Sequence, residues 1–310
     1  MKITIQELKE LCLPILIKRG LSPEDAETIF AEYLDGELRG RECHGISAFT
    51  TFGNKVVNPD IEEEVLKDES GLLYINGNGN LGQLVCNKFV PQLIEKAKKS
   101  NLAMMGIVNM SSYLMPGTYA RMIAEKDLVC FIFNYGGAPR LVPTGANEGV
   151  LGINPIAIGI PGKEFPLVSD YSPAVIAMGK VRLAKKLGKN IPAGIALDEN
   201  GKETIKAEEV VSLLPFCGYK GYALALTGEI LSRTMLNVEE KGKRGFFFMT
   251  INPAAFQDIN EFKENVSKLI SEIKSSRKAE GVKEIFVPGE RSERLKQENL
   301  KKGYLEIDEK

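Results

Sequence analysis

The chain has 310 residues, of which 44% are hydrophobic and 26% are charged, as expected for a globular protein with a hydrophobic core. Its 40 basic and 41 acidic residues are mixed along the chain and leave a net charge of −1, which argues against a nucleic-acid-binding protein with a dominant basic surface. No apolar run is long enough to span a bilayer and no signal-peptide cleavage site follows the amphipathic N-terminus, so we expect a cytoplasmic protein.

Helices are predicted within residues 4–45. Thr4 and Glu7 have the spacing of a capping box, in which the two side chains satisfy each other's backbone N–H groups at a helix start. Ser22 followed by Pro23 is a second start signal, because proline is favoured at the first helical position. The apolar residues that follow recur at helical spacing.

From about residue 70 the pattern changes to short apolar strands, glycine-rich turns and helices. Strands are expected at 72–75, 104–108, 129–133 and 156–160, and helices over 86–97 and 118–125. Later in the chain, helices are expected at 207–213, 220–233, 258–277 and 290–302, and strands at 245–251 and 284–287. This alternation predicts an α/β or mixed α+β fold.

Residues 77–82 read Gly-Asn-Gly-Asn-Leu-Gly, which matches a dinucleotide-binding fingerprint between a predicted strand and a predicted helix. In a Rossmann unit, an acidic residue at the end of the next strand binds the ribose hydroxyls. Here that strand is followed by Asn109, Met110, Ser111 and Ser112, and no acid is present. A tight strand-to-helix turn is therefore favoured, and a Rossmann phosphate site stays as the alternative.

His44 is the only histidine of the chain, and it lies between Cys43 and Gly45 just after a predicted helix. Histidine is the side chain best suited to proton transfer near neutral pH, although a single histidine is more often structural. The five cysteines are far apart and include no Cys-x-x-Cys pair. We therefore expect neither a disulfide framework nor a metal site.

Two charged residues occur in positions that suit chemistry. Asp170 follows a strand-like segment and could orient an imidazole or hold a cofactor hydroxyl, or it could simply initiate a turn. Lys220 opens a predicted helix between glycines and could reach a phosphate or carboxylate, although most such lysines are solvated.

Motifs in order along nearly the whole chain resemble those of the malate/L-lactate dehydrogenase-like oxidoreductase family, which includes malate, sulfolactate, ureidoglycolate and diketogulonate oxidoreductases and a cyclic-imine reductase. They are Leu-Arg-Gly at 38–40 with Cys-His-Gly at 43–45, Leu-Gly-Ile-Asn-Pro at 151–155, Asp-Tyr-Ser at 170–172, Ala-Met-Gly-Lys at 177–180, Ile-Pro-Ala-Gly at 191–194, Gly-Tyr-Lys-Gly-Tyr at 218–222, Asn-Pro-Ala-Ala-Phe at 252–256 and Pro-Gly-Glu at 288–290.

The resemblance implies a fold that is not Rossmann. Its cofactor domain, expected over 71–254, contains a mixed sheet, and a helical domain is expected from 1–70 together with 255–310. A homodimer is the usual assembly of the family. The resemblance also implies hydride transfer between NAD or NADP and a small carboxylate substrate, at a carbon that bears a hydroxyl or an imine next to the carboxylate.

Site residues are carried over by position. His44 and Asp170 would act in proton transfer. The cofactor would be lined by Gly136, Asp170, Tyr171, Ser172, Lys220, Pro288, Gly289 and Glu290.

Two positions depart from the family pattern. Ser112 stands where the family has a second histidine, and Ala48 stands where it has an arginine well placed to bind a substrate carboxylate. Arg41, Arg140 or Lys220 could supply a replacement charge. Three functions stay open: an NAD(P)-dependent 2-hydroxy-acid dehydrogenase, which we favour, a cyclic imino acid reductase on the same scaffold, and a cofactor-binding homologue with impaired catalysis.

Overall fold

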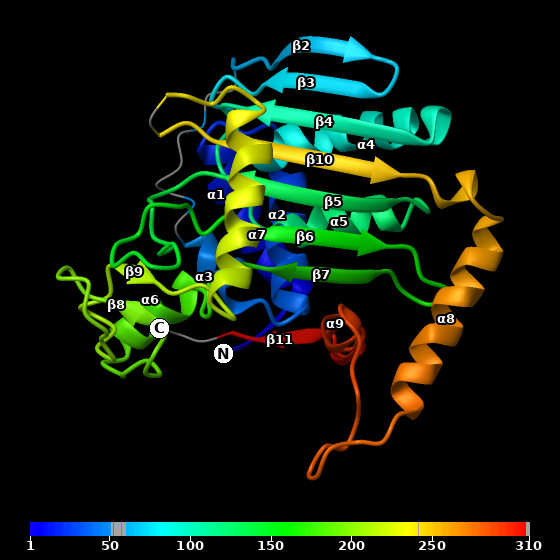
Figure 1. The fold of residues 1–310 in the computed structure, drawn as a ribbon. Helices are drawn as coiled ribbons and strands as arrows, with labels where there is room; N and C mark the ends of the chain where they lie inside the picture. Colours follow the sequence, from blue (N-terminus) through cyan, green and yellow to red (C-terminus); the bar gives the residue numbers. More distant parts are fainter. Residues whose placement is uncertain (51, 53–56, 58–59, 241, 308–310) are drawn as a thin grey trace.

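A seven-stranded mixed sheet forms the centre of the molecule (Figure 1). The computed structural model describes the whole chain except residues 51, 53–56, 58–59, 241 and 308–310. The strands are β2 (Glu64–Glu69), β3 (Leu72–Asn76), β4 (Leu102–Val108), β5 (Val129–Tyr135), β6 (Ile156–Ile160), β7 (Leu167–Tyr171) and β10 (Gly245–Ile251). Their order is β2-β3-β4-β10-β5-β6-β7, and the β3–β4 pair is parallel while the others are antiparallel. The predicted mixed, non-Rossmann sheet is confirmed.

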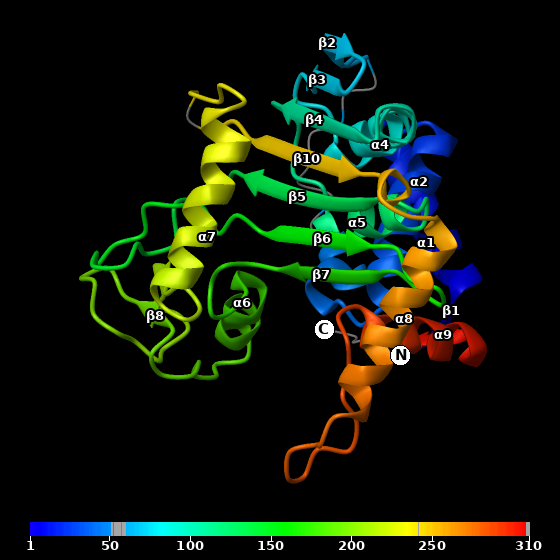
Figure 2. The ribbon, with the colours of Figure 1, turned by 45° about the vertical axis from the view of Figure 1, so that its right-hand side comes forward.

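Helices cover one face of this sheet (Figures 1 and 2). Counting those that lie elsewhere, the helices of the described chain are α1 (Ile5–Lys18), α2 (Pro23–Leu38), α3 (Ile46–Phe49), α4 (Gly82–Ser100), α5 (Pro116–Ala124), α6 (Met178–Lys186), α7 (Tyr219–Glu229), α8 (Ile259–Ser275) and α9 (Glu290–Lys302). Short turns η1 (Glu42–His44) and η4 (Pro253–Ala255) and a π-helical turn η3 (Ile230–Thr234) complete the set. α4 and α5 bury their apolar sides against the strands in the largest core cluster. Among the described residues, no helix is long and apolar enough to cross a bilayer.

The opposite face of the sheet is apolar but only partly covered. α7 crosses it near one end of the strands, where Gly228 approaches the ring of Phe133 (Figure 1). Beyond α7, Met104, Met249, Phe131 and Ile158 are opposite one another on four neighbouring strands, and each is half-buried. A sheet with apolar side chains on both faces is stable in water when both faces are covered.

The two ends of the chain lie together. β1 (Lys2–Thr4) pairs with β11 (Tyr304–Glu306), and α9 packs beside α2 (Figure 1). Asp35 on α2 pairs with Lys296 at 2.7 Å, and Arg39 pairs with Glu293. β2, although inside the range expected for the helical domain, pairs with β3 in the central sheet. The division into two domains stays a prediction.

Two predicted elements are wrong. Residues 207–213 form turns and the short strand β9 (Ser212–Leu213), which pairs with β8 (Ala196–Leu197). Residues 284–287 are irregular because their polar and aromatic side chains bind the neighbouring helix α9: the carboxylate of Glu284 accepts from Arg294, and the ring of Phe286 lies under Arg291 and Arg294. Both segments are short, and over so few residues periodicity does not separate helix, strand and loop.

Candidate active site

Six strand ends meet at one edge of the sheet, at the left in Figure 1. The parallel register of β3 and β4 and the antiparallel register of the other pairs bring the ends of β3, β4, β5 and β7 next to the starts of β6 and β10. Asn109, Arg244, Gly136 and Ser172 each directly adjoin one of these strand ends. Residues from distant parts of the chain therefore form one polar edge.

His44 is positioned by the turn η1, which packs on α2. Two glycines allow this approach, since a Cβ on Gly36 would lie 2.4 Å from the carbonyl oxygen of His44, and one on Gly45 would lie 2.2 Å from a carboxylate oxygen of Glu37. Burial lowers the pKa of His44, and the nearby guanidinium of Arg41 lowers this pKa further. The imidazole is therefore kept neutral at neutral pH.

Asp170 is held at the start of α5. Its Oδ2 accepts a hydrogen bond from the backbone N–H of Gly117 at 3.2 Å, and a Cβ on Gly117 would lie 2.5 Å from that oxygen. Burial raises the pKa of Asp170, although the guanidinium of Arg41, the Gly117 N–H and Arg121 act in the opposite direction. Arg41 acts on the pKa of both groups, so its guanidinium lies within electrostatic range of His44 and of Asp170.

A buried polar pair lies on the same face of the sheet. The hydroxyl of Tyr113 donates to Oδ1 of Asn134, whose amide donates to the carbonyl of Pro155 at 2.6 Å. Burial raises the pKa of Tyr113 well above its ordinary value, and Asp170 is among the negative groups that add to the rise. Ser112 is exposed beside this pair and donates to the Tyr113 carbonyl at 3.0 Å. A serine hydroxyl does not replace an imidazole as a base.

The glycines of residues 77–82 accommodate a neighbouring loop. A Cβ on Gly77 would lie 2.7 Å from Cβ of Met110, and one on Gly82 would lie 2.3 Å from the carbonyl oxygen of Ser111. The Gly82 N–H donates to the Ser111 hydroxyl at 3.1 Å. The tight strand-to-helix turn explains these glycines.

Several of the residues expected to line the cofactor adjoin this edge. Gly136 has a φ of +148°, and a Cβ there would lie 2.5 Å from Cγ of Arg244. Tyr171 is exposed, with its ring 6.1 Å from that of Phe216. Lys220 is exposed at the start of α7, and the following residue, Gly221, packs on the Phe216 backbone and the carbonyl of Pro173. Ser172 is half-buried.

The segment formed by Pro288, Gly289 and Glu290 lies farther along β7. A Cβ on Gly289 would be 3.0 Å from the N atom of Val168, two residues before Asp170. The buried carboxylate of Glu290 is bound by Lys274 and Arg294 and accepts from the Val287 N–H at 3.1 Å. The segment therefore flanks the strand of Asp170, but the Glu290 carboxylate is turned toward α8 and α9.

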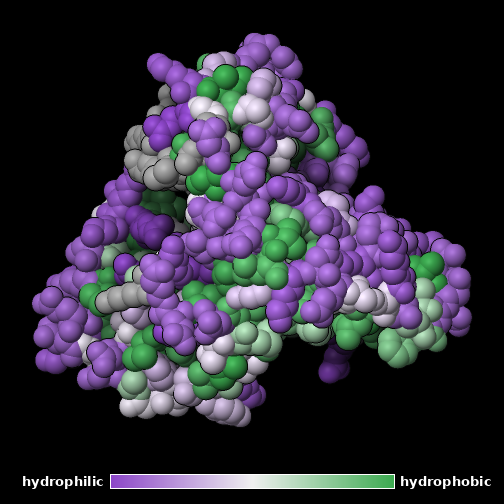
Figure 3. Space-filling view, turned by 90° about the horizontal axis from the view of Figure 1, so that it is seen from above, coloured by the Kyte–Doolittle hydropathy of each residue, from purple (hydrophilic) through white to green (hydrophobic). Residues whose placement is uncertain are grey.

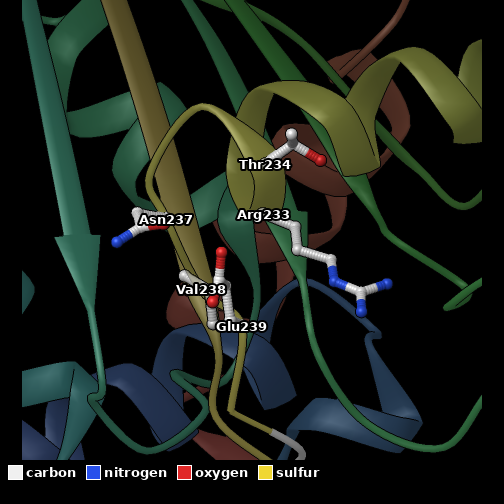
Figure 4. Close-up of a pocket in the computed structure, with 5 residues that line it drawn as sticks. All are labelled: Arg233, Thr234, Asn237, Val238 and Glu239. Carbon is white, nitrogen blue, oxygen red and sulfur yellow. The ribbon is translucent and has the colours of Figure 1, made fainter.

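A shallow pocket opens beside the start of β10 (Figure 4). It has a volume of about 270 Å³ and is lined by Arg233, Thr234, Asn237, Val238 and Glu239. Arg233 pairs with Glu229 at 2.9 Å and lies over the Tyr135 ring. Its guanidinium points away from Asn237, so these two side chains do not form one binding group (Figure 4).

Arg244 was not identified from the sequence, and neither was the Tyr113–Asn134 pair. The order of the strands is needed to place them, because the residues that surround them come from distant parts of the chain. A local signal existed only for Arg244, which directly precedes a predicted strand.

Comparisons with known proteins agree with this architecture. The model of the malate/L-lactate dehydrogenase family matches residues 3–310. The malate/(S)-sulfolactate dehydrogenase of Methanothermus fervidus is 34% identical, over 100% of this chain and 95% of its own length. The Delta(1)-pyrroline-2-carboxylate/Delta(1)-piperideine-2-carboxylate reductase of Pseudomonas aeruginosa is 28% identical, over 76% of this chain and 72% of its own length. The structure of sulfolactate dehydrogenase from Methanocaldococcus jannaschii superposes with a TM-score of 0.87 at 33% identity and covers 100% of this chain and 94% of that one.

Proposed function

The chain belongs to the malate/L-lactate dehydrogenase family of oxidoreductases, and we propose that it transfers a hydride between NAD or NADP and a small 2-hydroxy acid of the malate or lactate type. The observation that carries this proposal is the action of the Arg41 guanidinium on both His44 and Asp170, of which Asp170 lies in β7 near the polar edge of the sheet. A neutral imidazole, a guanidinium and a carboxyl group are the groups that oxidation of a hydroxy acid needs.

The same edge suits a dinucleotide. Gly136 leaves room for the side chain of Arg244, and Lys220 and Arg244 offer positive charge for phosphate groups. The cofactor supplies the hydride acceptor when it is bound. We propose that its lining is formed by Gly136, Asp170, Tyr171, Ser172 and Lys220, with Pro288, Gly289 and Glu290 at the flank of β7.

His44 is the proposed acid and base that exchanges the hydroxyl proton of the substrate. In the direction of alcohol oxidation, its neutral imidazole accepts the hydroxyl proton of the substrate, and in the direction of reduction the imidazolium returns it. Asp170 lies beside this path, where its carboxyl can orient the substrate or exchange a proton with it. Since position 112 is a serine, His44 and Asp170 carry this role without a second histidine.

Arg41 takes the role of the carboxylate-binding arginine that the family has at the position of Ala48. Of the three candidates, Arg140 donates to the carbonyl of Val211 at 3.2 Å, and Lys220 is exposed on α7. The Arg41 side chain is half-buried and acts on both His44 and Asp170. In the described part of the chain, its guanidinium has no hydrogen bond or ion pair, so it is available to a substrate carboxylate.

Replacing Arg41 by methionine is expected to raise KM for the 2-oxo acid about tenfold or more, because a charge-assisted hydrogen bond to the carboxylate is lost. The pKa of His44 should also rise, since a neighbouring positive charge no longer disfavours the imidazolium. The acid limb of the pH profile for alcohol oxidation therefore moves to higher pH. Arg140→Met serves as the matched control, and an unchanged KM in Arg41→Met would exclude this role.

The function is tested by following the absorbance of NADH and NADPH with pyruvate, oxaloacetate, sulfopyruvate and a cyclic imino acid. Turnover with a 2-oxo acid supports the proposal and identifies the preferred cofactor. Turnover with the imino acid alone supports the reductase alternative, which the Pseudomonas relative favours. Cofactor binding without turnover of any of these substrates supports the catalytically impaired alternative. The cytoplasmic location expected from the sequence stays a prediction.

The uncovered sheet face supports a homodimer. Met104, Met249, Phe131 and Ile158 form a continuous half-exposed apolar row across four strands. α8, at the far end of these strands, has no buried residue, and Leu269 and Ile273 on it are exposed. Apolar surface is also visible in Figure 3 at the right-hand end of the molecule, the end at which α8 lies in Figure 1. A second copy of the chain would cover this face by the same residues on both subunits.

Phe131→Glu and Met249→Lys are each expected to shift the protein from a dimer to a monomer, because a charge would be buried at the centre of the contact. Size-exclusion chromatography with light scattering measures the mass. Leu300→Lys, an equivalent change on the exposed side of α9, should leave the mass unchanged. A monomeric wild-type protein would contradict the proposed assembly.

A further inference from the structure

Arg244 is a half-buried cation that directly precedes β10. Among the residues that the structure describes, none forms an ion pair or a side-chain hydrogen bond with its guanidinium. Burial lowers the pKa of this arginine, and no carboxylate in the described part of the chain opposes the effect. Partial desolvation of an unpaired charge costs free energy, so such a residue is retained where an anion binds.

The strand register places Arg244 at the candidate active site. Phe246 is opposite Ile107 on β4 and Asn134 on β5, so Arg244, two residues earlier, adjoins Asn109 and Gly136. The Asn109 N–H donates to the Arg244 carbonyl at 3.0 Å, which fits this register. Its side chain lies across Gly136, where a Cβ would be 3.1 Å from Nη1.

Arg244 and Asp170 project from the same face of the sheet. Side chains alternate along a strand, so Arg244 shares the side of Phe246, and Asp170 shares the side of its partner Ala157. Phe246 and Ala157 both belong to the core that α4 and α5 cover. A ligand that contacts Asp170 can therefore continue along this edge to Arg244.

The separation of the two residues indicates which anion binds. Arg244 directly precedes β10 and Asp170 lies in β7, three strand spacings away, which corresponds to about 14 Å between the two strands. A small hydroxy acid held at His44 and Asp170 does not cover that separation, whereas a dinucleotide does. Arg41, moreover, acts on His44 and Asp170, where we propose that the carboxylate of the substrate binds.

We propose that Arg244 binds a phosphate group of the nicotinamide dinucleotide, with Gly136 providing the space in which the Arg244 side chain lies. This inference rests on the proposed function and adds the residue that determines cofactor affinity. A guanidinium suits this role because it remains protonated and can donate two parallel hydrogen bonds to phosphate oxygens.

The test compares Arg244→Met with the wild-type protein by fluorescence titration with NADH and NADPH and by the shift in Tm that each cofactor, ADP or 2′,5′-ADP produces. We expect the variant to bind cofactor about tenfold more weakly or worse, because charge-assisted hydrogen bonds are lost. The Tm of the ligand-free variant should not fall, since the desolvated charge is gone. Lys243→Met is the matched control, because it removes an equal charge from the adjacent residue, which donates to Asn109 at 2.8 Å.

Equal weakening of NADH, NADPH and ADP supports the proposal and assigns Arg244 to the pyrophosphate. Weakening confined to NADPH and 2′,5′-ADP supports it and assigns Arg244 to the phosphate on the adenosine ribose. Unchanged affinities in a folded variant overturn the proposal, and so does a rise in KM for the 2-oxo acid with unchanged cofactor affinity. A wild-type protein that binds neither cofactor would instead refute the proposed function itself.

Discussion

His44→Ala is expected to lower kcat by about two to four orders of magnitude, the contribution that a positioned general acid or base makes. His44 is the only histidine of the chain, so no second imidazole can take over the proton. Steady-state kinetics with the cofactor and 2-oxo acid identified above measure the loss. Cys43→Ser, which changes the exposed neighbour, should retain most of the activity. Full activity in His44→Ala would remove this residue from the mechanism.

The pH dependence gives a second measurement of the same residue. Burial and Arg41 lower the pKa of His44, so the neutral imidazole needed for alcohol oxidation persists below the ordinary value of about 6.5. Oxidation therefore loses activity only as the pH falls through this lowered pKa. Reduction, which needs the imidazolium, loses activity as the pH rises through the same value. If the kcat/KM profiles of oxidation and reduction share one pKa, and this pKa is absent in His44→Ala, the pKa belongs to His44.

Asp35→Ala is expected to have the largest effect on stability, a loss of about 3–5 kcal/mol. Asp35 pairs with Arg39 at 2.8 Å, Arg121 at 3.2 Å and Lys296 at 2.7 Å, and the side chain of Arg39 is only 3% exposed. The variant leaves these cations together without their central carboxylate. Domains are commonly stable by only about 5–15 kcal/mol, so this is a large share of the total.

Equilibrium unfolding in guanidinium chloride measures this loss. Glu293→Ala is the control, because it removes a more exposed partner of Arg39 and leaves Asp35 in place, and it should cost about 1 kcal/mol or less. Burial raises the pKa of Asp35, but Arg121, Arg39 and Lys296 together outweigh it and lower the pKa overall. Its stabilising contribution is therefore present above pH of about 4 and is lost as the pH falls through the lowered value. An Asp35→Ala variant as stable as Glu293→Ala would contradict this role.

Several elements could be predicted from the amino-acid sequence because their signals are local. The capping box of Thr4 and Glu7 and the Ser22–Pro23 start are both present in the structure, because a cap depends on residues only a few positions apart. The apolar spacing after residue 85 likewise predicted α4. The family motifs identified the fold and the class of reaction, and both are confirmed.

Contacts between distant parts of the chain follow from the packing of the whole fold. Gly117 meets Asp170, and Arg244 lies over Gly136, because α5 begins beside β7 and β10 inserts between β4 and β5. The same long-range packing turned residues 207–213 into turns and a short strand instead of a helix. Local propensities do not specify the order of the strands. The sequence could therefore identify His44 and Asp170 as candidates, whereas the arrangement of charges around them follows from the packing of the sheet and its helices.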